Sequence, residues 1–196
     1  MTMRLPRVGR ALRLSDRMKL RMIRLASGRE PSDILKLLFY RTDYFGNPFT
    51  AWVEAVLRGP SRWTVGEREL FAAFVSSLNQ CRFCQSSHGA IASIELGAEV
   101  TEAVIADWRT APVGPAVRAA LGFAEAVTLR PESVGAADVA PLRAAGVPAE
   151  AIADVVHVCA IFATMNRIAD AVDFAVPDER VQAAGAEAMR KRGYAI

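Results

Sequence analysis

Apolar residues recur every three or four positions through nearly the whole chain, and this spacing limits the fold more than any other feature. Residues at that spacing share one face of an α-helix, and such a face can be buried against other helices. The pattern predicts helices over residues 33–40, 48–57, 64–79, 81–97, 101–108, 115–129, 138–146, 149–174 and 178–192. No alternating strand pattern and no sequence repeat interrupts them. Because 52% of the residues are hydrophobic, we expect an all-α bundle with a buried core.

The length of 196 residues fits one domain, and no linker-like segment divides the chain. We expect a basic N-terminal extension over residues 1–30 and a single helical domain over residues 31–196. The extension concentrates basic residues, although the whole chain has a net charge of only +3. They are Arg4, Arg7, Arg10, Arg13, Arg17, Lys19, Arg21, Arg24 and Arg29. A mitochondrial transit peptide also starts this way, but we favour an extension that packs on a neighbouring subunit or stays mobile.

The composition also limits which kinds of partner and which cellular compartment we expect. No uninterrupted run approaches the roughly 18 apolar residues of a membrane-spanning helix, and arginines interrupt the N-terminus too often for a secretory signal. No DNA-binding motif or interleaved aromatic residues accompany the basic residues, so we expect neither nucleic acid nor a membrane as partner. Three cysteines are too few for a secreted disulfide framework, and a Cys-x-x-Cys pair in such a chain indicates a reducing compartment. We therefore expect a cytoplasmic protein.

The helix that begins at Thr64 has a clear start and two different faces. Thr64 and Glu67 fit a capping box, in which each side chain bonds the backbone N–H of the other residue. One face is apolar, whereas the other carries small side chains and one acid, Glu69. Small side chains let another helix approach closely, so this second face is the expected wall of a site. Thr101 and Asp138 are expected to cap the starts of two later helices.

Two thiols and an imidazole follow on the next helix. Cys81, Cys84 and His88 are spaced by three and four positions, which puts them on one helical stripe. Two thiols at this spacing can form a disulfide, and the imidazole can hold or remove a proton. Glu69 lies twelve residues before Cys81 and adds a carboxylate from the preceding helix. A carboxylate, an imidazole and a thiol pair are the components of a thiol redox site.

The chemistry of such a site follows from where the thiols lie. A helix N-terminus carries roughly half a positive charge and favours a thiolate. A thiolate attacks peroxide oxygen to give a sulfenic acid, and a second thiol converts this acid to a disulfide. Cys84 is the candidate attacking thiol because it lies one turn from His88, whereas Cys81 lies two turns away and is the candidate resolving thiol. His88 is expected to accept the thiol proton, and Glu69 to orient His88 or relay the proton.

Three other interpretations compete with a redox dithiol. A structural zinc site needs four ligands, and beyond the stripe only His157 and Cys159 remain, far along the chain, so we expect no metal. A thioredoxin fold needs the Cys-x-x-Cys after a strand, whereas a helical segment precedes it here. Cys81, Cys84 and His88 could also be core residues without a chemical role, since free cysteine is often buried. Core packing is the expected role of His157 and Cys159 themselves.

The same residues carry a resemblance to a known family. Glu69, Cys81, Cys84 and His88, with eleven, two and three residues between them, resemble the motif of the alkylhydroperoxidase AhpD-like proteins of the carboxymuconolactone decarboxylase superfamily. The resemblance implies an AhpD-like helical bundle with the Cys-x-x-Cys at the N-terminal part of a helix. It implies a thiol-dependent alkyl hydroperoxide reductase, a peroxidase and antioxidant enzyme with a redox-active disulfide. It also implies a homo-oligomer, commonly a trimer or hexamer, with a dimer as an alternative.

The resemblance spans about residues 35–175, including Asn166-Arg167 of the peroxidase-related branch, and departs from the motif at one position. The fullest AhpD motif has a second histidine just before the second cysteine, where this chain has Phe83. One proton-handling group is therefore missing. The expected partners are a hydroperoxide substrate and an external dithiol or protein reductant, with no bound cofactor. The alternative function is a non-catalytic oligomeric helical protein with a redox-sensing dithiol, or with a structural metal site.

Overall fold

A computed structural model of the chain describes residues 4, 8 and 12–194. All regular elements within these residues are helices, as expected. The α-helices are α2 (Leu14–Ser27), α3 (Asp33–Tyr40), α4 (Asn47–Arg58), α5 (Val65–Leu78), α6 (Arg82–Leu96), α7 (Ala98–Asp107), α8 (Pro115–Leu129), α9 (Ala136–Ala144), α10 (Ala149–Val172) and α11 (Glu179–Arg192). A π-helical turn, η1 (Thr42–Gly46), precedes α4, and a 3-10 turn, η2 (Pro131–Ser133), follows α8.

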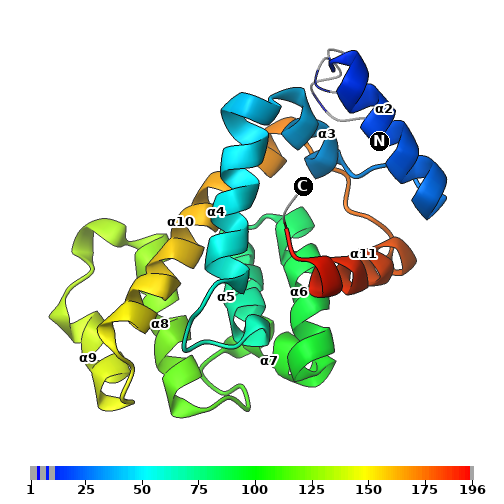
Figure 1. The fold of residues 1–196 in the computed structure, drawn as a ribbon. Helices are drawn as coiled ribbons and strands as arrows, with labels where there is room; N and C mark the ends of the chain where they lie inside the picture. The colour runs from blue at the N-terminus through cyan, green and yellow to red at the C-terminus, as the bar shows by residue number, and fades with distance from the viewer. Residues whose placement is uncertain (1–3, 5–7, 9–11, 195–196) are drawn as a thin grey trace.

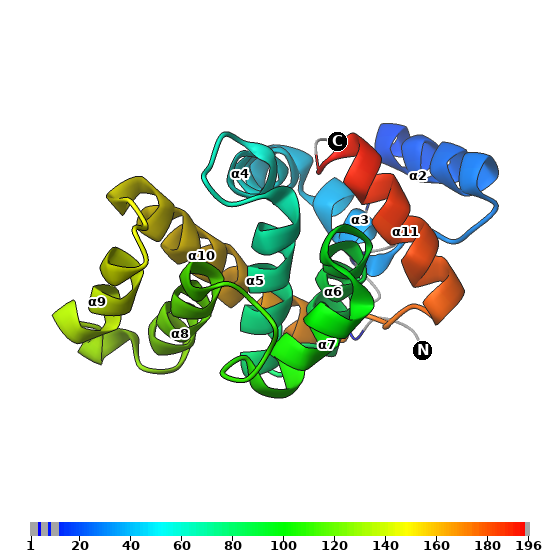
Figure 2. The same cartoon turned by 90° about the horizontal axis from the view of Figure 1, so that it is seen from below.

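Helix α5 lies at the centre of the bundle, with α4, α6, α8 and α10 around it (Figures 1 and 2). Ten of its fourteen residues are buried, so both of its faces are inside the protein. The apolar face joins the core through Leu70, Phe71 and Phe74, as the sequence predicts. The small-residue face is buried as well, because α6 runs directly alongside α5.

Small residues allow this close approach of α5 and α6. A Cβ atom on Gly66 would lie only 2.7 Å from the Cβ of Glu95 on α6, so no larger residue fits there without movement. Farther along, the hydrogen of Gly89 faces Ala73, whose Cβ would be 3.9 Å from an added Cβ. The close packing brings side chains of α5 within hydrogen-bond distance of α6.

The start of α5 has the predicted capping box. The Thr64 hydroxyl accepts a hydrogen bond from the Glu67 backbone N–H at 3.2 Å, and the Glu67 carboxylate accepts one from the Thr64 backbone N–H at 2.7 Å. These two bonds satisfy N–H groups that a helix otherwise leaves unpaired at its first turn. The local sequence thus sets where α5 begins.

Two other cap predictions are wrong. Helix α7 begins at Ala98, and Thr101 lies inside its first turn with its hydroxyl donating to the Gly97 carbonyl at 3.1 Å. Gly97, with φ of 98°, ends α6 and starts α7 at once, which leaves no separate cap position for a side chain. Asp138 likewise lies in the first turn of α9, where its carboxylate accepts the Gly135 backbone N–H at 2.8 Å.

A buried arginine holds the end of α4 against α5. Arg68 is 4% exposed and donates to the backbone carbonyls of Val56 and Gly59, both at 2.9 Å. Those carbonyls belong to the last turn of α4 and the residue after it, where a helix has no partners for its carbonyl groups. Arg68 therefore fixes how the end of α4, including Arg58, lies over α5.

Helix α10 is an example of a core helix that is also very apolar. By length and composition alone it could cross a membrane, although charged residues interrupt its sequence. In this fold it packs against α4, α5 and α8, with Val155 and Phe162 in the core. Cys159 is buried as expected, whereas the expected core position of His157 is wrong, because its side chain is exposed. Residues two positions apart on a helix point to nearly opposite sides, so the two side chains cannot both face the core.

The two ends of the chain pack differently. Helix α2 contacts α3 at one side of the bundle, while Arg7 and Arg10 of the predicted extension lie outside the described residues. Helix α11 lies along α6 in both views (Figures 1 and 2), with Ala186 buried between them. After α11 the chain turns back toward α4 and ends its described part at Tyr194.

Candidate active site

A tight turn places the two cysteines at the start of α6. Gln80 has a positive φ of 60°, which is uncommon for a residue other than glycine and costs about 1–2 kcal/mol. The backbone N–H of Cys81 donates back to the Ser76 carbonyl of α5 at 2.9 Å, which closes the turn. Cys81 is the residue that caps α6, and Cys84 lies in its first turn. The turn lets α6 run back along α5, so the thiols face the core.

The thiols and His88 are all nearly inaccessible to solvent. The exposed fractions are 0% for Cys81, 2% for Cys84 and 9% for His88, and both cysteines are free thiols. Buried surroundings strengthen electrostatic interactions and exclude water. The protonation of these side chains therefore depends on the few groups they contact.

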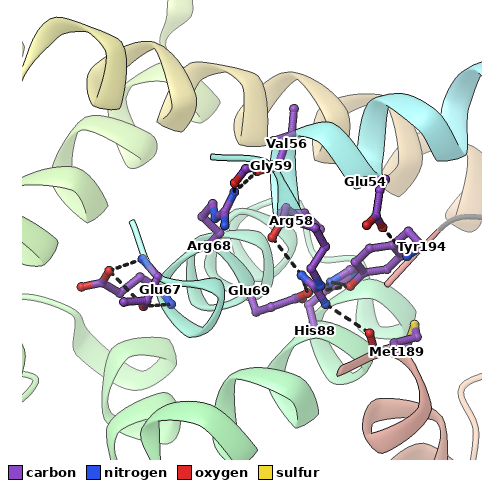
Figure 3. Close-up of polar contacts among 12 residues, drawn as sticks. Glu54, Val56, Arg58, Gly59, Glu67, Arg68, Glu69, His88, Met189 and Tyr194 are labelled. Carbon is purple, nitrogen blue, oxygen red and sulfur yellow. Dashed lines mark hydrogen bonds and ion pairs between the residues drawn. The ribbon is translucent and has the colours of Figure 1, made fainter. Parts of the chain in front are cut away.

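Glu69 of α5 contacts His88 of α6, as Figure 3 shows. The Oε2 atom of Glu69, itself 0% exposed, lies 2.7 Å from Nδ1 of His88. The Phe162 ring meets the imidazole edge-on with 4.5 Å between ring centroids, which restricts how it can rotate. Since Glu69 occupies Nδ1, Nε2 is the ring nitrogen that remains for a thiol proton.

Two residues that the sequence analysis did not single out also contact Glu69. Nη1 of Arg58, at the end of α4, lies 2.7 Å from Glu69 Oε1, and the Tyr194 hydroxyl donates to the same oxygen at 2.7 Å (Figure 3). The Tyr194 oxygen is also 3.2 Å from His88 Nδ1. Arg58 and Tyr194 lie 136 positions apart in the sequence, and no local pattern relates either one to Glu69. No spacing signal could have found them.

The contacts determine the charges of this cluster. Burial disfavours an ionised Glu69, but His88, Arg58 and the Tyr194 hydroxyl together outweigh burial and hold the pKa of Glu69 below its usual value. Burial and the adjacent Glu69 carboxylate raise the pKa of Tyr194 well above its usual value, so its phenol keeps its proton and donates. Burial acts against ionisation of Arg58, but Glu69 leads the contacts that raise its pKa overall.

The two thiols influence each other strongly. A hydrogen bond from the Cys84 thiol, helped by the Cys84 backbone N–H, lowers the pKa of Cys81 despite burial. The bond to Cys81 and burial together raise the pKa of Cys84 well above its usual value. Asn166 of α10 acts in the opposite direction on Cys84, whereas Asp170 raises the pKa of both thiols. Of the two thiols, Cys81 is therefore the one that ionises more readily.

An amide network joins α10 to the turn before the cysteines. Asn166, 1% exposed, donates from Nδ2 to the Ser76 hydroxyl at 3.0 Å and accepts from Asn79 Nδ2 at 2.9 Å. Ser76 and Asn79 belong to the last part of α5 and the residue after it, directly before the thiols. The network fixes α10, α5 and the start of α6 together.

Phe83 fills the motif position where the fullest AhpD pattern has a histidine. Its ring packs edge-on against Phe174, just beyond α10, with 5.2 Å between centroids, and it is 9% exposed. At this position the chain has an apolar contact beside the thiols, and the acid–base side chains of the motif that remain are Glu69 and His88.

The remaining cysteine and histidine lie elsewhere. Cys159 lies 3.9 Å from the Ala124 carbonyl in the core, and His157 is exposed on the surface of α10. Among residues 4, 8 and 12–194, no group of three or more histidine, cysteine or acidic side chains is arranged to hold a metal ion. The thiols do not line the shallow groove between α6 and α7, which encloses about 350 Å³.

Comparison with known proteins supports the family resemblance. The sequence matches the Carboxymuconolactone decarboxylase family over residues 44–126, a range that contains Glu69, Cys81, Cys84 and His88. An uncharacterized peroxidase-related protein with an alkylhydroperoxidase AhpD core from Ralstonia eutropha JMP134 is 29% identical, with a TM-score of 0.77 over 91% of this chain and 94% of that one. A peroxidase-related protein from Silicibacter sp. TM1040 is 27% identical, with a TM-score of 0.74 over 86% and 87%.

More distant structures share the fold alone. The debrominase Bmp8 without ligand is 22% identical, with a TM-score of 0.70 over 90% of this chain and 96% of that one. A cysteine-to-alanine variant of that debrominase was solved in complex with 2,3,4-tribromopyrrole. No curated protein matches the sequence. The family match includes the candidate site, and the two peroxidase-related structures share the fold over 91% and 86% of this chain, so the protein has an AhpD-like fold and its residues 44–126 match the carboxymuconolactone decarboxylase family.

Proposed function

We propose that this protein is a thiol-dependent hydroperoxide reductase in which Cys81 and Cys84 form the redox-active dithiol. The contact that supports it most is the 2.7 Å pair between Glu69 and His88 Nδ1, on the helix that also carries the dithiol. An imidazole oriented by a buried carboxylate is an arrangement that accepts and returns a proton. The peroxidase-related names of the similar structures from Ralstonia and Silicibacter support the same reaction class.

The reaction proceeds in two balanced steps. Cys84, after losing its proton to His88, attacks one oxygen of the hydroperoxide, and the O–O bond breaks. The alcohol leaves with the proton from His88, and Cys84 becomes a sulfenic acid. The Cys81 thiol then attacks the Cys84 sulfur, the S–O bond breaks, and water leaves with the Cys81 proton. The product is a Cys81–Cys84 disulfide, which an external dithiol or protein reductant must restore.

Two features of the site assign the first attack differently. The spacing assigns the first attack to Cys84, one turn before His88, whereas the hydrogen bonds lower the pKa of Cys81 and make it the easier thiol to ionise. A raised pKa at Cys84 means that this thiol needs a base, and His88 is the base on its side of the stripe. We therefore keep Cys84 as the proposed attacking thiol. Single substitutions of the two cysteines, described in the Discussion, distinguish the assignments.

The burial of the thiols bears on the substrate. Cys81 and Cys84 are 0% and 2% exposed, and Phe83 and Phe162 add apolar rings beside the stripe. A small or apolar hydroperoxide fits such surroundings better than a large charged one. We propose tert-butyl hydroperoxide and cumene hydroperoxide as the first substrates to test. A homo-oligomer stays part of the proposal, and sedimentation velocity measures it.

The decisive experiment combines turnover with mass analysis. Peroxide consumption is measured with dithiothreitol as reductant, and the oxidised protein is examined by intact mass and peptide mapping. We expect catalytic consumption, a loss of two hydrogens and a Cys81–Cys84 linkage, with Cys159 still reduced. A dominant bond from Cys159 to Cys81 or Cys84 would contradict the site. 2,3,4-Tribromopyrrole serves as the comparison substrate, because a protein of the same fold binds it.

The same experiment separates the enzyme from a redox sensor. A sensor forms the disulfide once with added peroxide but does not consume further peroxide when the reductant is present. Consumption that continues for many equivalents per protein supports the reductase. A single equivalent would overturn it in favour of the sensor.

A further inference from the structure

Four parts of the chain meet around one carboxylate. Arg58 ends α4, Glu69 lies within α5, His88 within α6, and Tyr194 follows α11 (Figure 3). The two oxygens of Glu69 have different partners: Oε2 contacts His88, while Oε1 contacts Arg58 and Tyr194, all at 2.7 Å. The side chains of Arg58 and His88 are each 11% exposed and that of Glu69 is 0% exposed. The charges of this cluster are thus shielded from water.

The charge balance of the cluster determines whether His88 can act as a base. A buried group of ions is most stable when its charges sum to zero. With Glu69 alone as partner, the sum is zero when the imidazole is protonated, and an imidazolium cannot accept a thiol proton. With Arg58 also on Glu69, the sum is zero when the imidazole is neutral. Neutral His88 can then accept a proton.

We propose that Arg58 is the countercharge that keeps His88 unprotonated at rest, and that Tyr194 holds Arg58 and Glu69 in this pairing. Both are positioning residues, since they act on the thiols through Glu69 and His88. This role matters for catalysis only if the protein is the reductase proposed above. Its test reads the protonation of His88 directly and needs no turnover.

The geometry of Tyr194 supports this role. Its phenol donates to Glu69 Oε1, and its ring lies under the Arg58 guanidinium, with 4.8 Å from the guanidinium carbon to the ring centroid. A tyrosine in this position touches both charged partners at once, by a hydrogen bond to the anion and a cation–π contact to the cation. Removing the phenol or the ring therefore changes the pairing of Arg58 and Glu69.

Helix α4 binds the chain around Tyr194 from two successive turns. The backbone N–H of Tyr194 donates to Glu54 Oε2 at 2.5 Å, and Arg58 Nη2 reaches the Met189 carbonyl at 3.5 Å. Gly193, with φ of 73°, lies so close to Glu54 that an added Cβ would be 2.5 Å from its carboxylate oxygen. The positive φ favours glycine here, and a larger residue would displace the Glu54 carboxylate. The end of the described chain is fitted to α4.

Other charged groups near these elements have their own partners. On α11 and the far end of α6, Arg190 pairs with Glu95 and Glu187, and Lys191 with Glu187. Arg68 bonds backbone carbonyls of α4 and the following turn. Helix α10 presents the apolar Phe162 to His88, and its Asp170 acts on the thiols. Glu54 of α4 is only partly buried and accepts the Tyr194 backbone N–H. Arg58 and Glu69 are therefore the charged side chains in direct contact within the buried cluster around the imidazole.

The countercharge also keeps the proposed proton transfer neutral. When Cys84 gives its proton to His88, the side chains become thiolate, imidazolium, Glu69 carboxylate and Arg58 guanidinium, and each new charge has an opposite charge as partner. Without Arg58, an ionised thiol leaves one net negative charge in a buried site. Removing the Arg58 charge should therefore make His88 easier to protonate and the reactive thiol harder to ionise.

The test is an NMR titration of the two histidines, which are the only ones in the chain. His157 is exposed and serves as the internal reference. The variants are Arg58→Met, which removes the charge, Arg58→Lys, which retains it, and Tyr194→Phe, which removes only the hydroxyl. The exposed Arg143 and Tyr44 give matched controls, Arg143→Met and Tyr44→Phe.

In the wild type, the ¹⁵N spectrum at pH 7 should show His88 as a neutral ring with its proton on Nδ1. Arg58→Met should raise the titration midpoint of His88 by at least one pH unit, a tenfold change in protonation. Tyr194→Phe should raise it by a smaller amount, and Arg58→Lys should restore most of the wild-type value. His157 and both controls should not change. Iodoacetamide labelling against pH should show the reactive thiol ionising at higher pH in Arg58→Met.

An imidazolium at His88 in the wild type at pH 7, or an unchanged or lower midpoint in folded Arg58→Met, would overturn the proposal. If Arg58→Met does not fold by circular dichroism, Arg58→Gln makes the same test, because it can bond Glu69 without a charge. A wild type that consumes no peroxide would refute the reductase and leave the titration result standing. The two failures are therefore distinguishable.

Discussion

Helices α6 and α10 each carry a cysteine and a histidine within five residues, yet only α6 combines them in one site. Cys84 and His88 are four positions apart and share a helix face, whereas His157 and Cys159 are two apart and point in nearly opposite directions. His88 is buried against Glu69, but His157 is exposed. Spacing by one helical turn, together with a buried acid, makes the difference.

The thiols of the two helices differ in the same way. Burial raises the pKa of Cys159 to about 12, and Thr128 only partly opposes it. Cys81 is just as buried, but hydrogen bonds from Cys84 lower its pKa. Burial by itself thus makes a thiol harder to ionise, and hydrogen-bond donors at a helix start can reverse this effect. Each prediction below tests this contrast.

The largest expected effect is the loss of peroxide consumption in Cys84→Ser. Cys159→Ser should consume peroxide at the wild-type rate, because Cys159 has no part in the dithiol. Cys81→Ser should still be oxidised once, to a sulfenic acid that a dimedone-type probe traps. The opposite pattern, with first oxidation lost in Cys81→Ser and kept in Cys84→Ser, would assign the attack to Cys81.

A smaller effect is expected from the relay residues. Glu69→Gln and His88→Ala should each slow thiol oxidation by about 10²–10⁴-fold, the usual contribution of a positioned acid–base group. The double variant should be little worse than either single one, because the two act as a unit. His157→Ala is the matched control and should keep the wild-type rate. Stopped-flow oxidation kinetics measure these rates after circular dichroism confirms folding.

A wild-type rate in folded Glu69→Gln would remove Glu69 from the relay. The candidate site would then contain Cys81, Cys84 and His88. Such a result would also weaken the proposed role of Arg58, which acts through the same carboxylate.

The smallest expected effect concerns stability at high pH. The folded protein raises the pKa of Cys159 from 9.0 to about 12, so only the unfolded chain ionises this thiol between those values. The unfolded state then binds fewer protons, and the free energy of unfolding falls as pH rises, by about 1.4 kcal/mol per pH unit. The contribution is complete below pH 9 and lost by about pH 12.

Urea unfolding at pH 8 and pH 10 should show this loss in the wild type and less of it in Cys159→Ala. The comparison of slopes cancels the cost of the cavity that alanine leaves at every pH. An equal loss in both proteins would show that Cys159 ionises with an ordinary pKa in the folded state.

Much of the fold could be predicted because its signals are local. The predicted helices over residues 33–40 and 115–129 have the bounds of α3 and α8, and the capping box at Thr64 starts α5. The caps at Thr101 and Asp138 were predicted wrongly, because Gly97 and Gly135 supply the turns there and the side chains move into the first helical turn. Which residue becomes the N-cap of a helix depends on the local backbone geometry, and the sequence pattern does not determine that geometry.

The candidate site also has one part that local spacing predicts and one part that it does not. By itself, the sequence determined that Cys81, Cys84 and His88 share a stripe, because positions three and four apart on one helix are neighbours whatever surrounds them. Only the tertiary structure decided that Glu69 contacts His88 with Arg58 and Tyr194 on its other oxygen. Those contacts arise where α4, α5, α6 and the chain after α11 pack together. Packing between distant segments depends on the whole set of buried surfaces, which no local spacing encodes.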